Sequence, residues 1–388
     1  MSTRGQQRFL GIGRPYIDED GLEEVRATLC SGWLTRGPRV RRFETELAHY
    51  IQTPFLSCLD SCTAGLWLAL LMSEIGPGDE VLVPANTFAS CANVVEHRGA
   101  TVVFVDCDPR TGLIDLAHAE HLAGSRTRAL LAVHLGGHPI DLDALARLGA
   151  RCGITIIEDA AHAIGARWRG RPIGSWGNLT SFSFHATKNM TTIEGGALVV
   201  ADAEQAERVE RLSLHGLSAS AWDRHGTGGP ARYDISEPGF KCAMNDVAAA
   251  IGLHQLKRLD GWIERRDTLS RAYDERLCDL PLELPAPVPP GARHARHLYA
   301  VRIRADAAVS RDDAMEALSA RGIGTSAHFR GLHLHTYYRE RCGLRPEHLP
   351  NSTDWSARTL TLPLHPGMDD ADIDHVSAAL TDVLTDTP

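Results

Sequence analysis

Ile154-Thr155-Ile156-Ile157-Glu158-Asp159 is a run of β-branched residues that ends on two acidic side chains. A short apolar run of this kind predicts a strand that is buried on both faces of a sheet. Six similar runs accompany it, and patterns typical of helices lie between several of them. This alternation predicts an α/β fold, in which a mixed, mostly parallel seven-stranded sheet carries helices on both faces. The other strand candidates are residues 55–59, 80–83, 101–105, 129–133, 179–184 and 196–200, and the helix candidates are residues 63–72, 89–97 and 142–152.

The pattern changes after Gly196, where the strict alternation of strands and helices stops. The elements predicted there are a helix at 203–214, a polar Gly-rich loop at 215–239, a long helix from 243 to 277, a Pro-rich linker at 280–291, a strand at 298–303 and helices at 311–321 and 370–384. We therefore expect a large domain at 1–255, which includes the N-terminal segment, and a small C-terminal α+β domain at 256–388.

The bulk properties are those of an ordinary globular chain. Of the 388 residues 43% are hydrophobic and 23% are charged, and the formal net charge of −9 argues against a nucleic-acid partner. No apolar stretch approaches the ~20 residues that cross a bilayer, and the N-terminus lacks an apolar signal region. The nine cysteines form neither a disulfide framework nor a zinc-ligand pattern. We therefore expect a reduced, cytoplasmic protein with no membrane partner and no metal.

A lysine lies just after a predicted strand, in the run Phe182-Ser183-Phe184-His185-Ala186-Thr187-Lys188-Asn189, and Asp159 ends another strand. A lysine amine can form a Schiff base, and a carboxylate can hold a ring nitrogen protonated. These are the two groups that pyridoxal 5'-phosphate (PLP) chemistry requires. Ligands of such sheets also bind beyond the carboxyl ends of the strands. The ordinary alternative is that Lys188 is a solvated surface residue.

Other residues near predicted strand ends suit the remaining parts of such a cofactor. Ser61-Cys62-Thr63 opens a helix, where backbone N–H groups favour a phosphate, and Ser183 could bind the same group. The alternative for this turn is a plain helix N-cap. Phe88 could stack on a flat ring or simply belong to the core. His162 could contact the ring or orient Asp159, and a purely structural histidine is the alternative.

Five motifs follow one another along nearly the whole chain. They are Ser31-Gly32-Trp33-Leu34-Thr35-Arg36-Gly37-Pro38, Pro84-Ala85-Asn86-Thr87-Phe88, Ile157-Glu158-Asp159-Ala160-Ala161-His162, Phe182 to Lys188 with Glu194-Gly195-Gly196, and Gly322-Ile323-Gly324-Thr325. In this order and spacing the chain resembles the DegT/StrS family of PLP-dependent sugar aminotransferases, which have the fold type I of PLP-dependent transferases. The segments 215–217, 221–224, 328–330 and 337–341 resemble enzymes that aminate a 4-keto nucleotide sugar, such as the UDP-4-amino-4-deoxy-L-arabinose synthesising aminotransferases.

The resemblance implies roles for the residues discussed above. Lys188 is the implied Schiff-base lysine, and Asp159 is the implied partner of the pyridinium nitrogen; both are catalytic. Further cofactor contacts are implied for Phe88 and His162 at the ring and for Cys62, Thr63 and Ser183 at the phosphate, the first two of these three through their backbone N–H groups.

The resemblance also implies a homodimer with shared active sites. Lys241, in the segment Gly239-Phe240-Lys241, stands where many relatives have an asparagine that contacts the partner's cofactor phosphate. The implied reaction takes an amino group from glutamate, releases 2-oxoglutarate, and aminates C4 of a keto-sugar carried on a nucleotide diphosphate. The candidates for binding that substrate are Arg36, His328, Arg330 and Tyr337.

Three other functions are compatible with parts of this pattern. Aminocyclitol aminotransferases of the same family would use a free keto-cyclitol. Related sugar dehydratases carry histidine in place of Lys188 and are therefore disfavoured. A non-catalytic regulatory protein on the same scaffold would not need the Lys188 and Asp159 pair, and the chain shows no helix-turn-helix and no basic arm.

Overall fold

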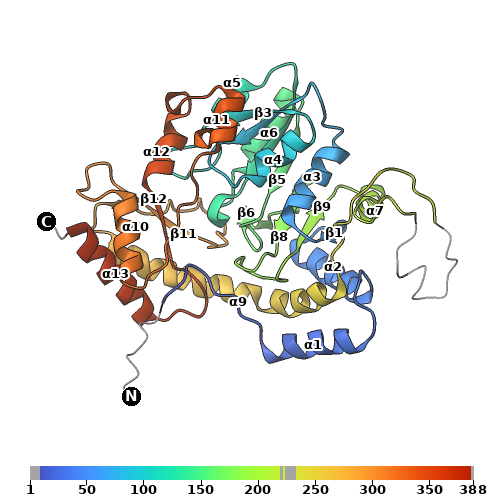
Figure 1. Ribbon diagram of the computed structural model, residues 1–388, viewed down its shortest axis with the longest axis horizontal. Helices are drawn as coiled ribbons and strands as arrows, with labels where there is room; N and C mark the ends of the chain where they lie inside the picture. The colour runs from blue at the N-terminus through green and yellow to red at the C-terminus, as the bar shows by residue number, and fades with distance from the viewer. Residues whose placement is uncertain (1–8, 219–221, 223–232, 386–388) are drawn as a thin grey trace.

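A seven-stranded sheet lies at the centre of the computed structural model, which describes residues 9–218, 222 and 233–385 (Figure 1). The strand order is β1-β9-β8-β5-β4-β2-β3. β9 runs antiparallel to both of its neighbours, and the other pairs are parallel. All seven predicted strands are thus confirmed in one mixed, mostly parallel sheet. Their bounds are β1 Leu56–Leu59, β2 Glu80–Pro84, β3 Thr101–Val105, β4 Thr127–Val133, β5 Thr155–Asp159, β8 Leu179–Ser183 and β9 Gly196–Val199.

Both faces of the sheet are buried because successive side chains point to opposite sides. Leu82 and Leu130 belong to the core on one face, and Val81 and Leu131 belong to the core on the other. The first face is covered by α2 (Pro38–Ile51), α5 (Leu116–Leu122), α6 (Leu142–Cys152) and the first half of α9 (Asp246–Leu277), and the second by α3 (Cys62–Met72), α4 (Ser90–His97) and α7 (Ala203–Leu212). The predicted coverage of both faces is therefore confirmed.

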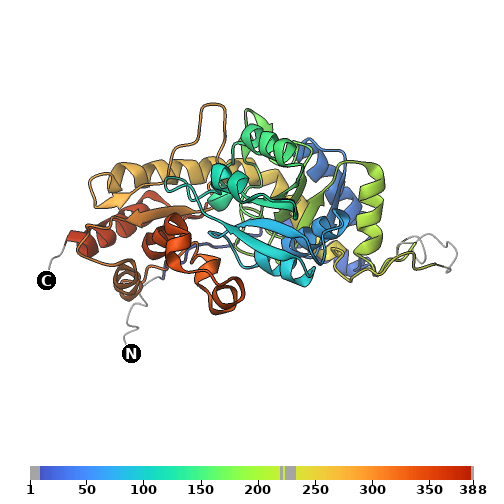
Figure 2. The same ribbon diagram turned by 90° about the horizontal axis from the view of Figure 1, so that it is seen from above.

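Helix α9 connects the sheet to the C-terminal elements as one continuous helix of 32 residues, and it can be followed across both ribbon views (Figures 1 and 2). Leu253 and Leu259 in its first half pack into the core of the sheet. Leu269 and Tyr273 in its second half pack into a separate core. The expected domain division after residue 255 falls inside this helix, so both parts of the chain share one rigid element.

The C-terminal part is built on a three-stranded antiparallel sheet, with the order β10-β11-β12. Leu282 of β10 pairs with Ile303, so the first residues of the expected Pro-rich linker form an edge strand instead. Leu10, which the expected division assigns to the large domain, bonds to the backbone of Gly322 and Gly324 at 2.8 Å in each case. The elements of this part are β10 Leu282–Glu283, β11 Tyr299–Ile303, β12 Thr359–Leu362, α10 Arg311–Ala320, α11 Thr336–Cys342, α12 Pro350–Arg358 and α13 Asp370–Thr385.

Several short or polar elements were not predicted. One of them is α1 (Glu19–Cys30), whose first turn is capped by the side chain of Asp18, which accepts a 2.8 Å bond from the Gly21 N–H. The others are α2, α5, α11 and α12, the strands β10 and β12, the hairpin strands β6 (Arg167–Trp168) and β7 (Arg171–Pro172), and the 3₁₀ turns η1 (Leu135–Gly137), η2 (Leu332–Leu334) and η3 (Pro346–His348). None of the described helices is both long enough and apolar enough to cross a bilayer.

The packing of α2 on α9 gives a stability test. A Cβ added at Gly252 would lie 2.7 Å from the Cζ of Phe43, whose ring is fully buried, so Gly252→Ala should cost ~1–3 kcal/mol through overpacking. Gly261 on the same helix has no atom within 4 Å of that position, so Gly261→Ala should raise stability by up to ~1 kcal/mol. Thermal unfolding midpoints of the two variants should therefore move in opposite directions. A midpoint for Gly252→Ala at or above that of the wild type would contradict this packing.

Candidate active site

A cavity of about 340 Å³ lies at the carboxyl ends of β5 and β8 and at the start of α3. It brings together eight of the residues singled out from the sequence, namely Cys62, Thr63, Phe88, Asp159, His162, Ser183, Lys188 and His328. The other lining residues are Ser61, Thr87, Ser90, Val133, Ala161, His185, Thr187, Glu194, Gly195, His297 and Phe329. The site therefore combines the edge of the large sheet with loops of the C-terminal part.

Lys188 is held by the tight turn that follows β8. Its N–H donates to the carbonyl of His185 at 2.9 Å, and the loop returns with a 2.8 Å bond from the Thr192 N–H to the carbonyl of Phe184. Burial lowers the pKa of the Lys188 amine below its ordinary value, and the negative charge of Asp159 offsets part of this effect. A lysine with a lowered pKa has a larger neutral fraction, and the neutral amine is the nucleophile.

Asp159 is the last residue of β5 and is 4% exposed. Its Oδ1 accepts a 2.9 Å bond from the Ala161 N–H, but no basic side chain of the described residues forms an ion pair with it. Its neighbour Glu158 differs, because the ring of His134 lies 2.7 Å from its carboxylate. A buried carboxylate is costly without a cation, and a protonated ring nitrogen would supply one. Asp159 therefore fits the expected cofactor.

The first turn of α3 faces the cavity as a site for an anion. Ser61 caps the helix by accepting a 3.1 Å bond from the Ala64 N–H, so the N-cap interpretation of this turn is confirmed. The N–H groups of Cys62 and Thr63 have no acceptor within the helix, as in any first turn. The hydroxyl of Ser183 lines the same cavity. The cap uses the N–H of Ala64, and a phosphate would use those of Cys62 and Thr63, so one turn can serve both functions.

Gly196 shows how closely the chain surrounds this turn. A Cβ at this position would lie 2.4 Å from the carbonyl carbon of Ser61 and 2.5 Å from the nitrogen of Cys62. Only glycine lets β9 approach the start of α3 so closely. The pair Gly195-Gly196 therefore has a packing role at the edge of the anion site.

Two aromatic side chains and His162 form one wall. Phe88 is 61% exposed and lies 6.0 Å from the ring centre of Phe329, which stacks near-parallel on His162 at 6.1 Å. The Nδ1 of His162 accepts a 3.1 Å bond from the Gly136 N–H, so the neutral ring carries its proton on Nε2. Burial, and then the charge of Lys188, lowers the pKa of His162 well below its usual range. His162 is thus a neutral ring held by the backbone.

His297 is a cavity residue that the sequence did not reveal. Its Nδ1 lies 3.2 Å from the Oδ1 of Asn189, whose Nδ2 donates to the carbonyl of Ala295 at 2.6 Å. A carbonyl can only accept, so Asn189 must present its oxygen to His297, and Nδ1 must carry the ring proton. The Nε2 of His297 is then an acceptor. His297 and Asn189 are 108 positions apart, so no local pattern connects them.

Arg36 requires a correction, because the structure does not bring it to the cavity. It is 6% exposed, and its guanidinium bonds to Glu44 at 2.9 Å, to Glu210 at 3.2 Å and to the carbonyl of Cys58 at 3.2 Å. These contacts tie α2 and α7 to β1. We therefore do not retain Arg36 as a substrate contact.

Arg330 and Tyr337 lie outside the cavity wall, whereas His328 is part of it. Arg330 is exposed and donates a 3.1 Å bond to the carbonyl of Leu334. The hydroxyl of Tyr337 donates to Glu96 at 3.2 Å. Burial, and then the charge of Lys188, lowers the pKa of His328 to about 4. For Arg330 and Tyr337, which are exposed and lie outside the cavity wall, the contact with the substrate therefore remains a prediction.

Lys241 is exposed and does not line the cavity of its own chain. Its backbone pairs with Leu214, and its charge acts on the nearby carboxylate of Asp60. This place is compatible with the predicted contact to a partner subunit. Residues 221, 223 and 224 of the 221–224 segment lie outside the described residues.

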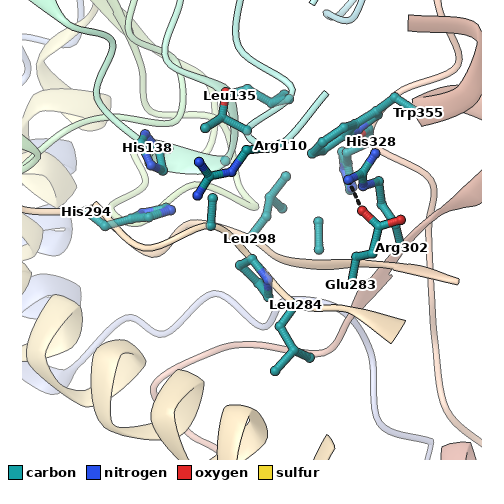
Figure 3. A pocket seen from close by; sticks show the side chains of 15 residues that line it. Arg110, Leu135, His138, Glu283, Leu284, His294, Leu298, Arg302, His328 and Trp355 are labelled. Carbon is teal, nitrogen blue, oxygen red and sulfur yellow. Dashed lines mark hydrogen bonds and ion pairs between the residues drawn. The ribbon is translucent and has the colours of Figure 1, made fainter. Parts of the chain in front are cut away.

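A second, smaller cavity of about 50 Å³ lies where the two parts of the chain meet, and His328 lines both cavities (Figure 3). In this view Arg302 faces Glu283, and its guanidinium lies 4.7 Å from the ring centre of Trp355. The space is too small for a nucleotide. Within the part of the chain that the structure describes, no group of three or more histidine, cysteine or acidic side chains is arranged to hold a metal ion.

The pattern of the DegT/DnrJ/EryC1/StrS aminotransferase family matches residues 15–381. The chain belongs to this family. It is therefore a PLP-dependent sugar aminotransferase, and the predicted family, fold class, enzyme class and cofactor are confirmed.

Individual relatives match over almost their whole length. The spore coat polysaccharide biosynthesis protein SpsC of Bacillus subtilis is 42% identical over 381 residues, which cover 98% of each chain. Spr1654 of Streptococcus pneumoniae, described as a sugar aminotransferase and solved in its PMP form, is 33% identical with a TM-score of 0.91, over 96% of this chain and 98% of that one. The aminotransferase TlmJ of Streptoalloteichus hindustanus is 34% identical with a TM-score of 0.89, over 97% and 98%.

The placement of Arg36 predicts a structural phenotype. Arg36→Met should destabilise the protein by ~3 kcal/mol, because it leaves the largely buried Glu44 without its cation. Arg42→Met in α2 is the control, since the pair of Arg42 with Glu46 is more exposed and should be worth less than ~1 kcal/mol. Thermal unfolding followed by circular dichroism measures both. If Arg36→Met kept the wild-type midpoint and instead raised the KM for the sugar, the substrate role would return.

Proposed function

We propose that the chain transfers an amino group from L-glutamate to C4 of a keto-sugar carried on a nucleotide diphosphate, in the cytoplasm. The observation that carries the amino-transfer part is the pairing of the half-buried Lys188 and the buried Asp159 in one cavity, which the start of α3 also lines. The sugar-nucleotide part is supported by His328 in the wall of the cavity and by the exposed Arg330, which lies outside that wall two residues further along the chain.

Each residue of the pair has a distinct task in this reaction. Lys188 attaches the cofactor and, when free and neutral, takes the proton from the Cα of the amino donor. Asp159 holds a proton on the ring nitrogen through its negative charge. When bound, the cofactor supplies the electron sink for the donor carbanion. Ser183 and the N–H groups of Cys62 and Thr63 would hold the phosphate, and Phe88 and His162 would contact the ring.

The size of the cavity favours a substrate that extends out of it. Its volume of about 340 Å³ lies at the lower end of the range for small-molecule sites, ~300–1,000 Å³. This space suits the cofactor and one sugar ring, so a nucleotide diphosphate would lie on the surface beyond the mouth. Arg330 and Tyr337 are both exposed, and we infer that they face this part of the substrate, since an arginine can bind a phosphate with two parallel hydrogen bonds.

We also propose a homodimer with shared active sites. Several large apolar side chains are exposed on the single chain, among them Phe88 at the cavity, Ile193 in the loop after Lys188, and Phe240 next to Lys241, with exposed fractions of 61%, 57% and 50%. We infer that a partner subunit covers these side chains. Lys241 would then contact the cofactor phosphate of the partner subunit.

A free keto-cyclitol is the second candidate substrate, because the same cavity volume would hold it without any nucleotide. The two candidate substrates differ in the side chains that they require outside the mouth of the cavity. A cyclitol needs no partner there, and a nucleotide diphosphate needs cationic groups.

The central test combines a lysine variant with a substrate panel. In the wild type, borohydride reduction should fix the cofactor on the peptide that contains Lys188, and amination should be found with UDP- or dTDP-4-keto-sugars by mass spectrometry and NMR of the product. Lys188→Ala should lose both the adduct and turnover, because no other amine replaces it in the site. Efficient amination of a keto-cyclitol, with no reaction of any nucleotide sugar, would replace the proposed substrate by the second candidate.

Arg330 should act only on the sugar half of the reaction. Arg330→Ala should raise the KM for the nucleotide sugar about tenfold, as expected for one charge-assisted hydrogen bond to a phosphate. The glutamate half-reaction should keep its rate, since no nucleotide is present in it. Arg304→Ala is the control, because Arg304 is exposed and pairs with Asp306 instead. An equal loss in both half-reactions would mean that Arg330 supports the fold of the site rather than the substrate.

A further inference from the structure

Two cysteine side chains contact the carboxylate of Asp159, and neither has a role in the site as described so far. The Sγ of Cys91, at the start of α4, lies 3.0 Å from Oδ2 of Asp159. The Sγ of Cys62 lies 3.7 Å from Oδ1 and 3.5 Å from the carbonyl of Ser181. Both cysteines are buried, Cys91 completely. The two oxygens of one buried carboxylate are thus contacted from two different helices.

The donors and acceptors at Cys91 can be assigned by elimination. An ionised carboxylate can only accept, so the single proton of the Cys91 thiol lies toward Asp159. The hydroxyl of Thr87, which lies 3.4 Å from the same sulfur, then donates to it. Burial, and then the charge of Asp159, raises the pKa of the Cys91 thiol well above its ordinary value, so this thiol stays protonated and remains a donor.

Cys62 is a weaker donor to the carboxylate. Its one proton is shared between the carbonyl of Ser181 and Asp159, and both contacts are longer than that of Cys91. The second firm donor to Asp159 is the N–H of Ala161, which bonds to Oδ1. Oδ2 has only the Cys91 thiol as donor among the described residues.

We propose that Cys91 is a positioning residue that fixes the orientation of the Asp159 carboxylate toward the cofactor ring nitrogen. The terminal torsion of an aspartate is broad, so a donor on one oxygen leaves the group free to turn. Ala161 on Oδ1 and Cys91 on Oδ2 together hold its plane. The inference rests on the proposed role of Asp159, and it adds that this role depends on a thiol of α4.

The experiment compares Cys91→Ala, Cys91→Val and Cys91→Ser in the holoenzyme. Alanine and valine remove the donor, and valine also keeps the volume of the side chain filled. Serine keeps a donor in the same place. The measurements are the absorbance of the bound cofactor against pH, the dissociation constant of the cofactor, and the rate and KM of the glutamate half-reaction.

Cys91→Ala and Cys91→Val should slow the half-reaction about three- to tenfold, as for one hydrogen bond of ordinary strength, with little change in KM. They should also shift the midpoint of the absorbance titration and weaken cofactor binding. Cys91→Ser should recover most of each property. Cys107→Ala is the control, because Cys107 is an equally buried thiol of the sheet core outside the cavity, and it should lower only the unfolding midpoint.

Two results would overturn the proposal: a wild-type absorbance titration and rate in both donor-free variants, or a loss in Cys91→Ser as large as in Cys91→Ala, which would assign Cys91 to packing. If Cys91→Ala does not fold, the comparison of Cys91→Val with Cys91→Ser tests the proposal with the same measurements. Asp159→Asn, measured alongside, separates this proposal from the proposed function. If Asp159→Asn retained the wild-type rate, the role of Asp159 itself would be wrong, whatever the cysteine variants show.

Discussion

A carboxylate buried at the end of a central strand has to be met by hydrogen-bond donors and by a cation, and the arrangement of this site follows from that requirement. Asp159 is 4% exposed, and the chain gives it a backbone N–H and a thiol but no ion pair among the described residues. A cationic ring nitrogen beside it would balance this charge directly. The ring nitrogen of the cofactor would thus be the ion-pair partner that Asp159 does not have among the described residues.

The sheet order explains why the groups that surround Asp159 come from distant parts of the sequence. β5 lies next to β8, so the turn that carries Lys188 begins one strand away from Asp159. β1 leads into the first turn of α3, and Gly196 allows β9 to lie directly against that turn. The C-terminal part, attached through the continuous helix α9, adds His297, His328 and Phe329. The cavity is therefore complete only when the C-terminal part packs against the large sheet.

The success and failure of prediction here have different physical origins. The strands were predictable because burial on both faces requires continuous apolar runs, which are visible locally, as at Ile154-Thr155-Ile156-Ile157. Helices α1 and α2 were missed because their sequences are mostly polar and charged and depend on packing against α9. Arg36 was expected at the substrate because a nucleotide diphosphate is anionic and Arg36 is a cationic residue of a family motif. Its carboxylate partner Glu210 is 174 positions away, and only the folded chain brings the two together.

By itself, the sequence determined the alternation of elements, the family, and the residue types that the cofactor requires, since these depend on local periodicity and on motifs of a few residues. The tertiary structure alone decided which of the polar residues share one cavity. It excluded Arg36, added His297, and placed the thiol of Cys91 against Asp159, 68 positions along the chain. The reason is that burial, hydrogen-bond partners and charge balance are properties of contacts between distant segments, and no window of sequence contains both sides of such a contact.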